Sequence, residues 1–367
     1  MRFDKILHNK TYATVHAEPM IDRHGADILS VVAKLTLSFD RAGQLGLSAR
    51  PVRLYDVPDG SGGIRYPSDL AAEKVGTDIA LVGSLIPPEK PPQNQVLAWL
   101  RVGSLGKAAH VFGPRVFMSG LQAAAPGPAA ALTRTPLTHS LAYGGVDPDS
   151  ETWLSTRTAP SHAQPFSHEP HNPVGRGHAT SPGKLVGRPA PQIEPAPLPD
   201  VYPPPDVRSA GARAQAAFAP VPPQWEPRRS RTGTEDERWR RTRAPVTPED
   251  WDPRSESWAP WGLWSETPLT GTEPVEIGGL RPGAPIRFLL PGFTPVFQSI
   301  ERGLLRDHPT HLDSVLFDLD DGLVEIGFRT AIVLPTKWAR VERVAVLPQR
   351  PLSREIVDRP QPRGSTA

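Results

Sequence analysis

Proline constrains this chain more than any other residue type, because 46 of its 367 residues are proline and another 31 are glycine. Proline has no backbone N–H and fixes φ, so it interrupts helices and is confined to strand edges and loops. A chain so rich in proline cannot be mostly helical. It can form strands joined by long, stiffened loops, and the sequence therefore predicts a mainly β fold with few short helices.

Charge and cysteine content exclude several classes of protein. With 41 basic and 39 acidic residues the formal net charge is +2, which gives no global attraction to nucleic acid or to an anionic membrane. The absence of cysteine excludes disulfides, thiolate metal sites and cysteine nucleophiles. No stretch approaches the roughly 20 apolar residues of a membrane span, and the N-terminus lacks a signal-peptide core. We expect a cytoplasmic protein with no nucleic-acid or membrane partner.

Alternating apolar and polar residues predict strands in the N-terminal part. The clearest case is 28–40, where the apolar side chains from Leu29 to Phe39 occupy alternate positions. This period is typical of a strand with one face on a core. Further strands are expected at 77–85, 95–103 and 109–112.

The C-terminal part contains the strongest local signal, a hairpin. Residues 315–319 and 323–334 flank the turn Asp320-Asp321-Gly322, and Asp-Gly supports the positive φ values that tight hairpins need. The carboxylates near this tip, including Asp318, are expected to be solvated. The other expected elements are a strand at 285–291, a helix at 296–305, and a strand or short helix at 338–347.

The middle of the chain has a different composition. Half of the prolines fall between 160 and 274, and apolar periodicity is weak there. Six tryptophans between 225 and 264 nevertheless argue against a fully disordered linker. We expect 218–275 to be ordered, irregular chain held by aromatic side chains, and 188–215 and the tail 351–367 to be disordered.

These segments predict one large, β-sandwich-like domain over 1–350. It would comprise an N-terminal β block (1–155), a proline- and tryptophan-rich insertion (156–275) and a C-terminal β block (276–350). Neither block has many strands, so packing them together is the simplest way to bury both apolar faces.

No familiar catalytic or metal-binding motif is present. The stretch Asn172–Gly177, "NPVGRG", lacks the lysine and spacing of a phosphate loop, which favours a constrained turn over a ligand contact. No GxSxG elbow occurs. Four histidines lie close in sequence, but their spacing matches no familiar zinc arrangement: His162, His168, His171 and His178. We therefore predict no enzymatic activity, no metal and no cofactor.

Two clusters in the insertion leave alternatives open. Stacked indoles of Trp258, Trp261 and Trp264 would suit a carbohydrate- or cell-wall-binding module, whereas buried indoles would order the proline-rich segment. The basic run from Arg228 to Arg231 is offset by acidic neighbours, which favours a solvated or partner-facing surface over nucleic-acid binding.

Several short motifs together resemble the domain-of-unknown-function family 2169. They occur in the family's order from about residue 28 to about residue 335. They are "YPSDLA" (66–71) with Lys74 and "TDI" (77–79), "VFGPR" (111–115), "PL" (136–137) leading to "AYGG" (142–145), "NPVGRG" (172–177), Trp225 with "PR" (227–228), "GT" (233–234) with Asp236 and Trp239, "DWD" (250–252), "GTE" (271–273) and "FR" (328–329).

This resemblance implies an accessory role in bacterial type VI secretion. Family members are encoded beside spike proteins of the VgrG and PAAR types and beside toxic effectors, and they are thought to load an effector onto the spike. We therefore expect a non-enzymatic adaptor whose partners are an effector and spike proteins, and which holds the effector in a groove between the β blocks. The candidate partner-surface residues are Asp69, Lys74, Arg115, Asn172, Gly175, Arg176, Gly177, Trp225, Arg228 and Trp239.

Overall fold

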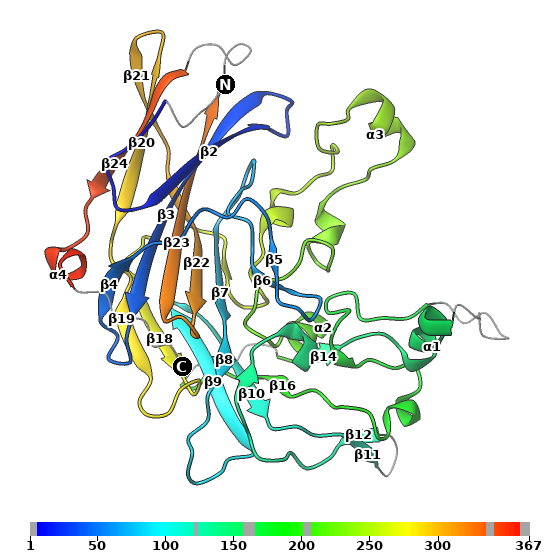
Figure 1. Cartoon of the computed structure of the whole chain (residues 1–367). Helices are drawn as coiled ribbons and strands as arrows, with labels where there is room; N and C mark the ends of the chain where they lie inside the picture. The colour runs from blue at the N-terminus through cyan, green and yellow to red at the C-terminus, as the bar shows by residue number, and fades with distance from the viewer. Residues whose placement is uncertain (1–5, 121–123, 157–165, 201–206, 335–340, 360–367) are drawn as a thin grey trace.

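The computed structural model describes residues 6–120, 124–156, 166–200, 207–334 and 341–359. These ranges are mostly strands and irregular chain, with short helices at the periphery (Figure 1). The prediction of a mainly β fold is thereby confirmed. None of the helices in the described ranges has the length and apolarity needed to span a membrane.

The largest sheet takes strands from both ends of the chain. In order, its strands are β17 (Trp264–Ser265), β7 (Thr77–Val82), β22 (His311–Asp318), β23 (Leu323–Val333), β3 (Asp27–Phe39) and β2 (Thr14–Ile21), with β4 (Leu45–Ser48) also paired to β3. β22 runs parallel to β7, and β23 runs antiparallel to β3. The two predicted β blocks are therefore hydrogen-bonded into one sheet.

Two further sheets complete the framework. The five-stranded sheet has the order β16 (Ile193–Ala196), β10 (Leu105–Phe112), β9 (Gln95–Val102), β18 (Pro274–Gly278) and β19 (Ile286–Leu289). The four-stranded sheet has the order β1 (Leu7–Asn9), β24 (Val341–Arg350), β20 (Thr294–Glu301) and β21 (Leu304–His308). Both sheets also join segments that are distant in sequence (Figure 1).

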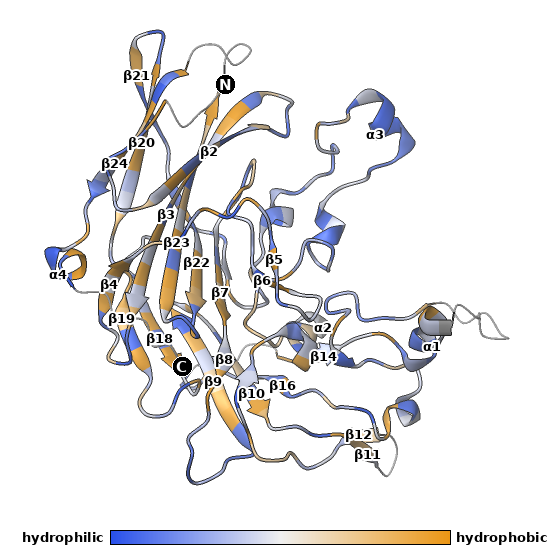
Figure 2. Cartoon of the chain, viewed as in Figure 1, coloured by the Kyte–Doolittle hydropathy of each residue, from blue (hydrophilic) through white to orange (hydrophobic). Residues whose placement is uncertain are grey.

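One apolar core connects the three sheets. It contains Leu35 of β3, Leu100 of β9, Ile277 of β18 and Phe297 of β20, each at most 2% exposed. Figure 2 shows the same distribution, with hydrophobic strands in the centre and hydrophilic residues on α3 (Glu237–Thr242). This shared core accounts for the sandwich-like packing.

The local predictions at the C-terminus have mixed outcomes. The hairpin is confirmed as β22 and β23, and the segment 338–347 is a strand where it is described, within β24. The predicted helix at 296–305 is wrong, since β20 and β21 form a second hairpin there. Its turn consists of Arg302 and Gly303, both with positive φ (51° and 76°), as a tight hairpin requires.

The insertion is ordered more extensively than expected. Phe218, Trp225 and Trp258 are at most 5% exposed, in agreement with the prediction for 218–275. The predicted disorder of 188–215 is wrong for its described part, which contains β16. The predicted disorder of 351–367 is also wrong for its first residues, because Leu352 joins the core. Residues 360–367 lie outside the described ranges.

Short elements connect the sheets and cover their edges. They are β5 (Val57–Pro58), β6 (Ile64–Tyr66), β8 (Ser84–Leu85), β11 (Phe117–Ser119), β12 (Ala124–Pro126), β13 (Thr135–Pro136), η2 (His139–Leu141), β14 (Tyr143–Gly144), α1 (Pro148–Thr156), β15 (Arg176–Gly177), η3 (Pro182–Leu185), α2 (Ala210–Ala214), η4 (Arg229–Arg231), η5 (Pro253–Glu256) and α4 (Arg354–Val357).

Candidate functional site

The polar face of the large sheet is covered by other parts of the chain. Ser30, Lys34 and Thr36 of β3 alternate with the core residues, yet each is at most 2% exposed. The covering chain includes the "YPSDLA" motif, whose Asp69 accepts a hydrogen bond from the Lys34 ammonium at 2.6 Å. The carbonyl oxygen of Asp69 accepts another from the Arg329 guanidinium at 2.6 Å. The motif therefore fixes a loop to a polar sheet face.

The remainder of this motif forms a second buried ion pair. The Lys74 ammonium lies 2.8 Å from the carboxylate of Asp78, which is 0% exposed. The Asp78 carboxylate also accepts hydrogen bonds from the Ser257 hydroxyl and the Trp258 backbone N–H. The Lys74 ammonium lies 4.7 Å from the centre of the Trp258 ring. The N-terminal motif thereby positions the tryptophan-rich loop.

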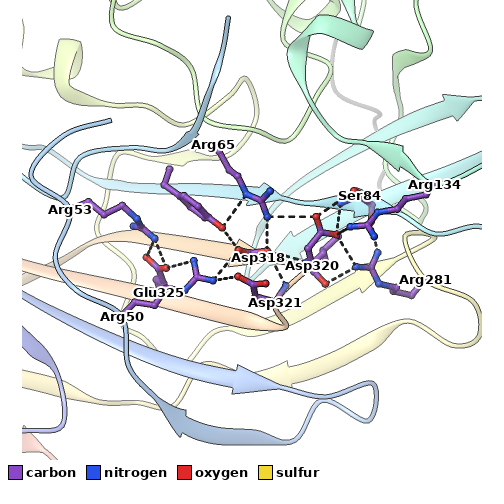
Figure 3. Close-up of polar contacts among 12 residues, drawn as sticks. Arg50, Arg53, Arg65, Ser84, Arg134, Arg281, Asp318, Asp320, Asp321 and Glu325 are labelled. Atoms are coloured by element: carbon purple, nitrogen blue, oxygen red, sulfur yellow. Dashed lines mark hydrogen bonds and ion pairs between the residues drawn. The ribbon is translucent and has the colours of Figure 1, made fainter. Parts of the chain in front are cut away.

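The carboxylates of the hairpin tip belong to a layer of ion pairs (Figure 3). Asp318, expected to be solvated, is 1% exposed and accepts a hydrogen bond from the Tyr66 hydroxyl. Its carboxylate also lies 3.4 Å from Arg50 and 3.6 Å from Arg65. Burial, followed by the hydrogen bond to Asp318, raises the pKa of Tyr66 and keeps its hydroxyl a donor. The expectation of solvation is wrong for Asp318, because the arginine-bearing segment covers it, and it is confirmed for Asp321, which is exposed.

The layer extends on both sides of Asp318 in Figure 3. On one side Glu325, buried on β23, pairs with Arg53. On the other, Asp320 lies 3.1 Å from Arg134 and 3.7 Å from Arg281. Opposite charges thus alternate through the layer, and each carboxylate is neutralised by a guanidinium. Such an arrangement resists the separation of its parts, since removing one partner leaves a poorly solvated charge.

Several motifs converge on a small polar cavity of about 240 Å³. Its walls include Lys74, Arg228, Arg329 and Glu256. Burial raises the pKa of Glu256, an effect that Arg228, Lys74 and Arg329 oppose. The hydroxyl oxygen of Ser255, also in the wall, is buried without a hydrogen-bond partner. The cavity is a meeting point of ionic groups, but no nucleophile in it is paired with a general base.

The "NPVGRG" motif forms a turn that clamps a neighbouring segment. Asn172 is 0% exposed, and its side-chain amide donates to the carbonyl oxygens of His139 and Tyr143, both at 2.8 Å. β15 pairs in parallel with β14, and the Arg176 N–H donates to the Ala142 carbonyl at 2.9 Å. The interpretation as a constrained turn agrees with this geometry.

Gly175 and Arg176 of the motif have packed rather than free surroundings. A Cβ atom on Gly175 would lie 2.8 Å from the Ala142 oxygen and 2.8 Å from the Gly144 Cα. The Arg176 guanidinium is half-buried and 3.4 Å from the side-chain oxygen of Gln192. Glycine is therefore required at 175 by close packing, and Arg176 is oriented toward the chain itself.

The other candidate residues are dispersed. Trp225 packs edge-on against His139 behind the turn, with ring centres 5.5 Å apart. Arg115 donates to the Pro191 carbonyl at 2.7 Å and tethers the segment before β16. Trp239, on α3, donates to the Val246 carbonyl at 2.7 Å and is remote from the rest (Figure 1). None of the ten candidates is fully exposed, so each contributes first to the internal structure.

The three tryptophans considered from sequence differ in exposure, since Trp261 and Trp264 are partly exposed and Trp258 is not. Trp258 is 5% exposed and has Lys74 against its ring, so it is not available for stacking on a sugar. His171 pairs with Glu169 at 2.8 Å, while His162 lies outside the described residues. Across the described ranges, no group of three His, Cys, Asp or Glu side chains is placed to hold a metal ion.

Sequence reasoning missed the buried charges of the sheet. Asp318, Glu325 and Lys34 each lie on the polar face of their strand, on β22, β23 and β3 respectively. Charged residues at such positions are also the pattern of a solvated sheet face. A usable signal was the excess of arginine in 50–65, close in sequence to the recognised motif. Opposite charges on a sheet face and on an adjacent loop predict pairing, but not the partner of each residue.

Comparison with known proteins gives one positive result. A search of curated proteins and a search of solved structures each found no match. The model of one family, described as an uncharacterized protein conserved in bacteria (DUF2169), matches residues 24–329. The match includes the covered sheet face, the polar cavity and the "NPVGRG" turn, and it spans well over half of the chain. This chain therefore belongs to the DUF2169 family.

Proposed function

We propose that this protein is a cytoplasmic, non-enzymatic adaptor that binds an effector and helps to load it onto the VgrG/PAAR spike of a type VI secretion system. Two considerations support the proposal. The motifs resemble those of proteins thought to have this role, and the matched residues with ionic side chains hold the fold together. An adaptor needs a shaped surface and no reactive group.

The observation that carries the proposal is a cavity of about 790 Å³ beside the "NPVGRG" turn. Gly177 of the turn and Tyr143 of the clamped segment are part of its wall. Most of the remaining wall is apolar: Phe117, Ala124, Pro126, Ala179, Pro182, Leu185, Pro191, Pro195 and Val207. Three charged residues, Glu194, Arg208 and Arg213, complete it. We call it the apolar cavity. A volume and composition of this kind suit an apolar segment of a partner polypeptide.

The rigidity of the cavity wall favours binding by shape. Proline contributes four of the wall residues and has little conformational freedom to lose. Asn172 fixes one side of the wall through the turn, and Arg115 fixes another through the Pro191 carbonyl. A pre-formed wall reduces the entropy lost when a partner is bound.

Capture of the effector tests the proposal. The effector encoded beside this gene would be co-expressed with the tagged adaptor and recovered by pull-down. The variant Val207→Asp introduces a charge into the apolar cavity, whereas the control Val333→Asp introduces the same charge at an exposed position on β23. We expect wild type and Val333→Asp to capture the effector, and Val207→Asp to recover at least tenfold less of it.

Two outcomes would contradict the proposal. Failure of the wild-type chain to recover any adjacent effector or spike protein would remove the adaptor role. Equal capture by Val207→Asp, with a thermal transition like that of wild type, would place the partner elsewhere.

A further inference from the structure

A second cavity, of about 360 Å³, lies between the turn that carries Arg228 and the loop that carries the tryptophans. Its volume is in the range of small-molecule sites. We call it the tryptophan–arginine cavity and define it by Gln215, Arg228, Arg231, Ser257, Trp261 and Trp264. It shares no lining residue with the apolar cavity of the proposed adaptor function.

The charge of this cavity is one-sided. It is lined by Arg228 and Arg231, and no Asp or Glu is among the described residues of its wall. A third basic side chain in the wall, His171, is already hydrogen-bonded to Glu169 at 2.8 Å. The cavity therefore presents positive charge with no carboxylate of its own to balance it.

Arg228 is the more deeply placed of the two arginines. It is 8% exposed, and its guanidinium donates to the carbonyl oxygens of Ser255 at 2.8 Å and Val221 at 2.7 Å. No carboxylate of the described chain lies within ion-pair distance of it. Buried charges are ordinarily paired, because an unpaired one is costly to desolvate. Two of its five N–H donors hold the backbone, which leaves others for a ligand.

Glu256, Asp78 and Asp56 act on the charge of Arg228 from outside the cavity wall, and Glu256 lines the polar cavity instead. The acidic groups that act on Arg231 are Asp252 and Glu226, and both are already engaged. Glu226 accepts hydrogen bonds from the backbone N–H of Ser230 at 3.2 Å and from its hydroxyl. Asp252 pairs with Arg254 at 2.6 Å. The Arg231 side chain forms neither a hydrogen bond nor an ion pair with any described residue, although it is half-buried. Both guanidinium groups therefore have capacity for an external anion.

The remaining wall is apolar and fixed in place. Trp261 and Trp264 contribute indole surface. The side-chain oxygen of Gln215 accepts from the Trp261 backbone N–H at 3.0 Å, and its amide donates to the Glu226 carbonyl at 2.9 Å. An anion that enters this cavity meets two guanidinium groups at one side and indole surface at another. Indole walls favour an organic body over a fully hydrated ion such as free phosphate.

We propose that the tryptophan–arginine cavity binds an organic carboxylate attached to an apolar or aromatic body. Arg228 and Arg231 receive the carboxylate through charge-assisted hydrogen bonds, for which the planar guanidinium is well suited. The indoles of Trp261 and Trp264 receive the body. A peptide can present this chemistry through its C-terminal carboxylate or through an acidic side chain beside an apolar residue.

Ligand titration followed by NMR or calorimetry tests this site on the full chain. The probes are N-acetylphenylalanine, its uncharged amide, and N-acetylglutamyl-phenylalaninamide, whose only carboxylate is on the side chain. We expect the acid to bind at least tenfold more tightly than the amide, a difference that corresponds to about 1.4 kcal/mol. The third probe distinguishes the two peptide sources.

Variants locate the binding. Arg231→Gln should weaken binding of the acid about tenfold. It should leave the fold intact, because the Arg231 guanidinium has no structural partner to lose. Arg229→Gln is the matched control, since Arg229 is exposed on the same turn and does not line the cavity. Arg228→Gln should abolish binding of the acid if the variant folds. The comparison of Arg231→Gln with Arg229→Gln tests the site whether or not Arg228→Gln folds.

Three results would overturn the proposal. These are equal affinity for the acid and the amide, an equal loss in Arg229→Gln and Arg231→Gln, and no binding of any probe at millimolar concentration. Effector capture by the adaptor is measured separately, so failure of the carboxylate site and failure of the adaptor role can be told apart.

Discussion

Lys107 provides the most stringent test of the packing described above. It lies on β10, is 2% exposed, and donates a hydrogen bond to the Gln215 carbonyl. No carboxylate of the described chain pairs with it, and burial lowers its pKa well below 10.5. We predict that Lys107→Met, which keeps the length of the side chain and removes the amine, makes the protein more stable at pH 7.

The size of the stability gain can be bounded by the free energy of removing the proton from Lys107. A buried lysine avoids most of its desolvation penalty by losing its proton. At pH 7, roughly 3.5 units below the ordinary pKa of 10.5, deprotonation of a solvated lysine costs about 5 kcal/mol. This is the upper limit of the penalty. Methionine leaves the Gln215 carbonyl without its donor, which costs about 1–3 kcal/mol. We expect a net gain of about 1–3 kcal/mol for Lys107→Met, within the range seen when buried charges are replaced by apolar groups.

The gain should depend on pH in a defined direction. The folded pKa of Lys107 is below that of the unfolded chain, so the unfolded state binds a proton that the folded state lacks. Wild-type stability must therefore rise with pH between the folded pKa and 10.5. The advantage of Lys107→Met should be largest at neutral pH and should shrink as pH approaches 10.

Urea unfolding followed by tryptophan fluorescence measures this difference at pH 7, 8.5 and 10. Lys10→Met, at an exposed position, is the control and should change stability by less than about 0.5 kcal/mol. A Lys107→Met protein that is less stable than wild type at pH 7, or an advantage independent of pH, would refute the reasoning. Either result would mean that a group other than the Gln215 carbonyl stabilises the ammonium.

Three further predictions concern stability. Burial, then Lys107, lowers the pKa of His139 to about 4, so stability should fall by roughly 3 kcal/mol as pH drops from 6.5 to 4, and His139→Gln should remove this slope in denaturant titrations. Burial opposes the ionisation of Asp313, but Arg329 and Lys74 hold its pKa at about 2; Asp313→Asn should cost about 3–5 kcal/mol in urea unfolding. Gly175→Ala should cost about 1–3 kcal/mol through overpacking, whereas Gly183→Ala, with open space around it, should lower the melting temperature little.

The sequence predicted the strands whose inward faces are purely apolar. Leu29 to Phe39 alternate without a polar residue on the core side, and the structure places them in β3. The prediction of a helix at 296–305 was wrong for the opposite reason. On β20 the buried positions are occupied by Phe297, Ser299 and Glu301, so the period of two is hidden by polar residues. The Ser299 hydroxyl donates to Glu301, an interaction that hydropathy patterns do not record.

The insertion shows a second limit of prediction from sequence. Composition indicated that aromatic side chains would order 218–275, but it gave no information on which strands they would contact. β16, inside the segment expected to be disordered, pairs with β10. That pairing joins residues more than 80 positions apart in sequence, such as Val111 and Ile193. Proline-rich segments can therefore be ordered without a local signal when they complete a sheet.

The charged layer explains why the "YPSDLA" motif is recognisable although it contains no catalytic group. A period of two shows which residues share a sheet face, but not what covers that face. For Lys34 the covering group is Asp69, and for Asp318 it is Tyr66, both from this motif or adjoining it. Exchange of either motif residue removes one hydrogen bond from a buried charge, which keeps its longer ion pairs with Glu325 or with Arg50 and Arg65. A family signature can therefore record the internal assembly of a binding body, and the residues that select its partner are better sought on the walls of its two cavities.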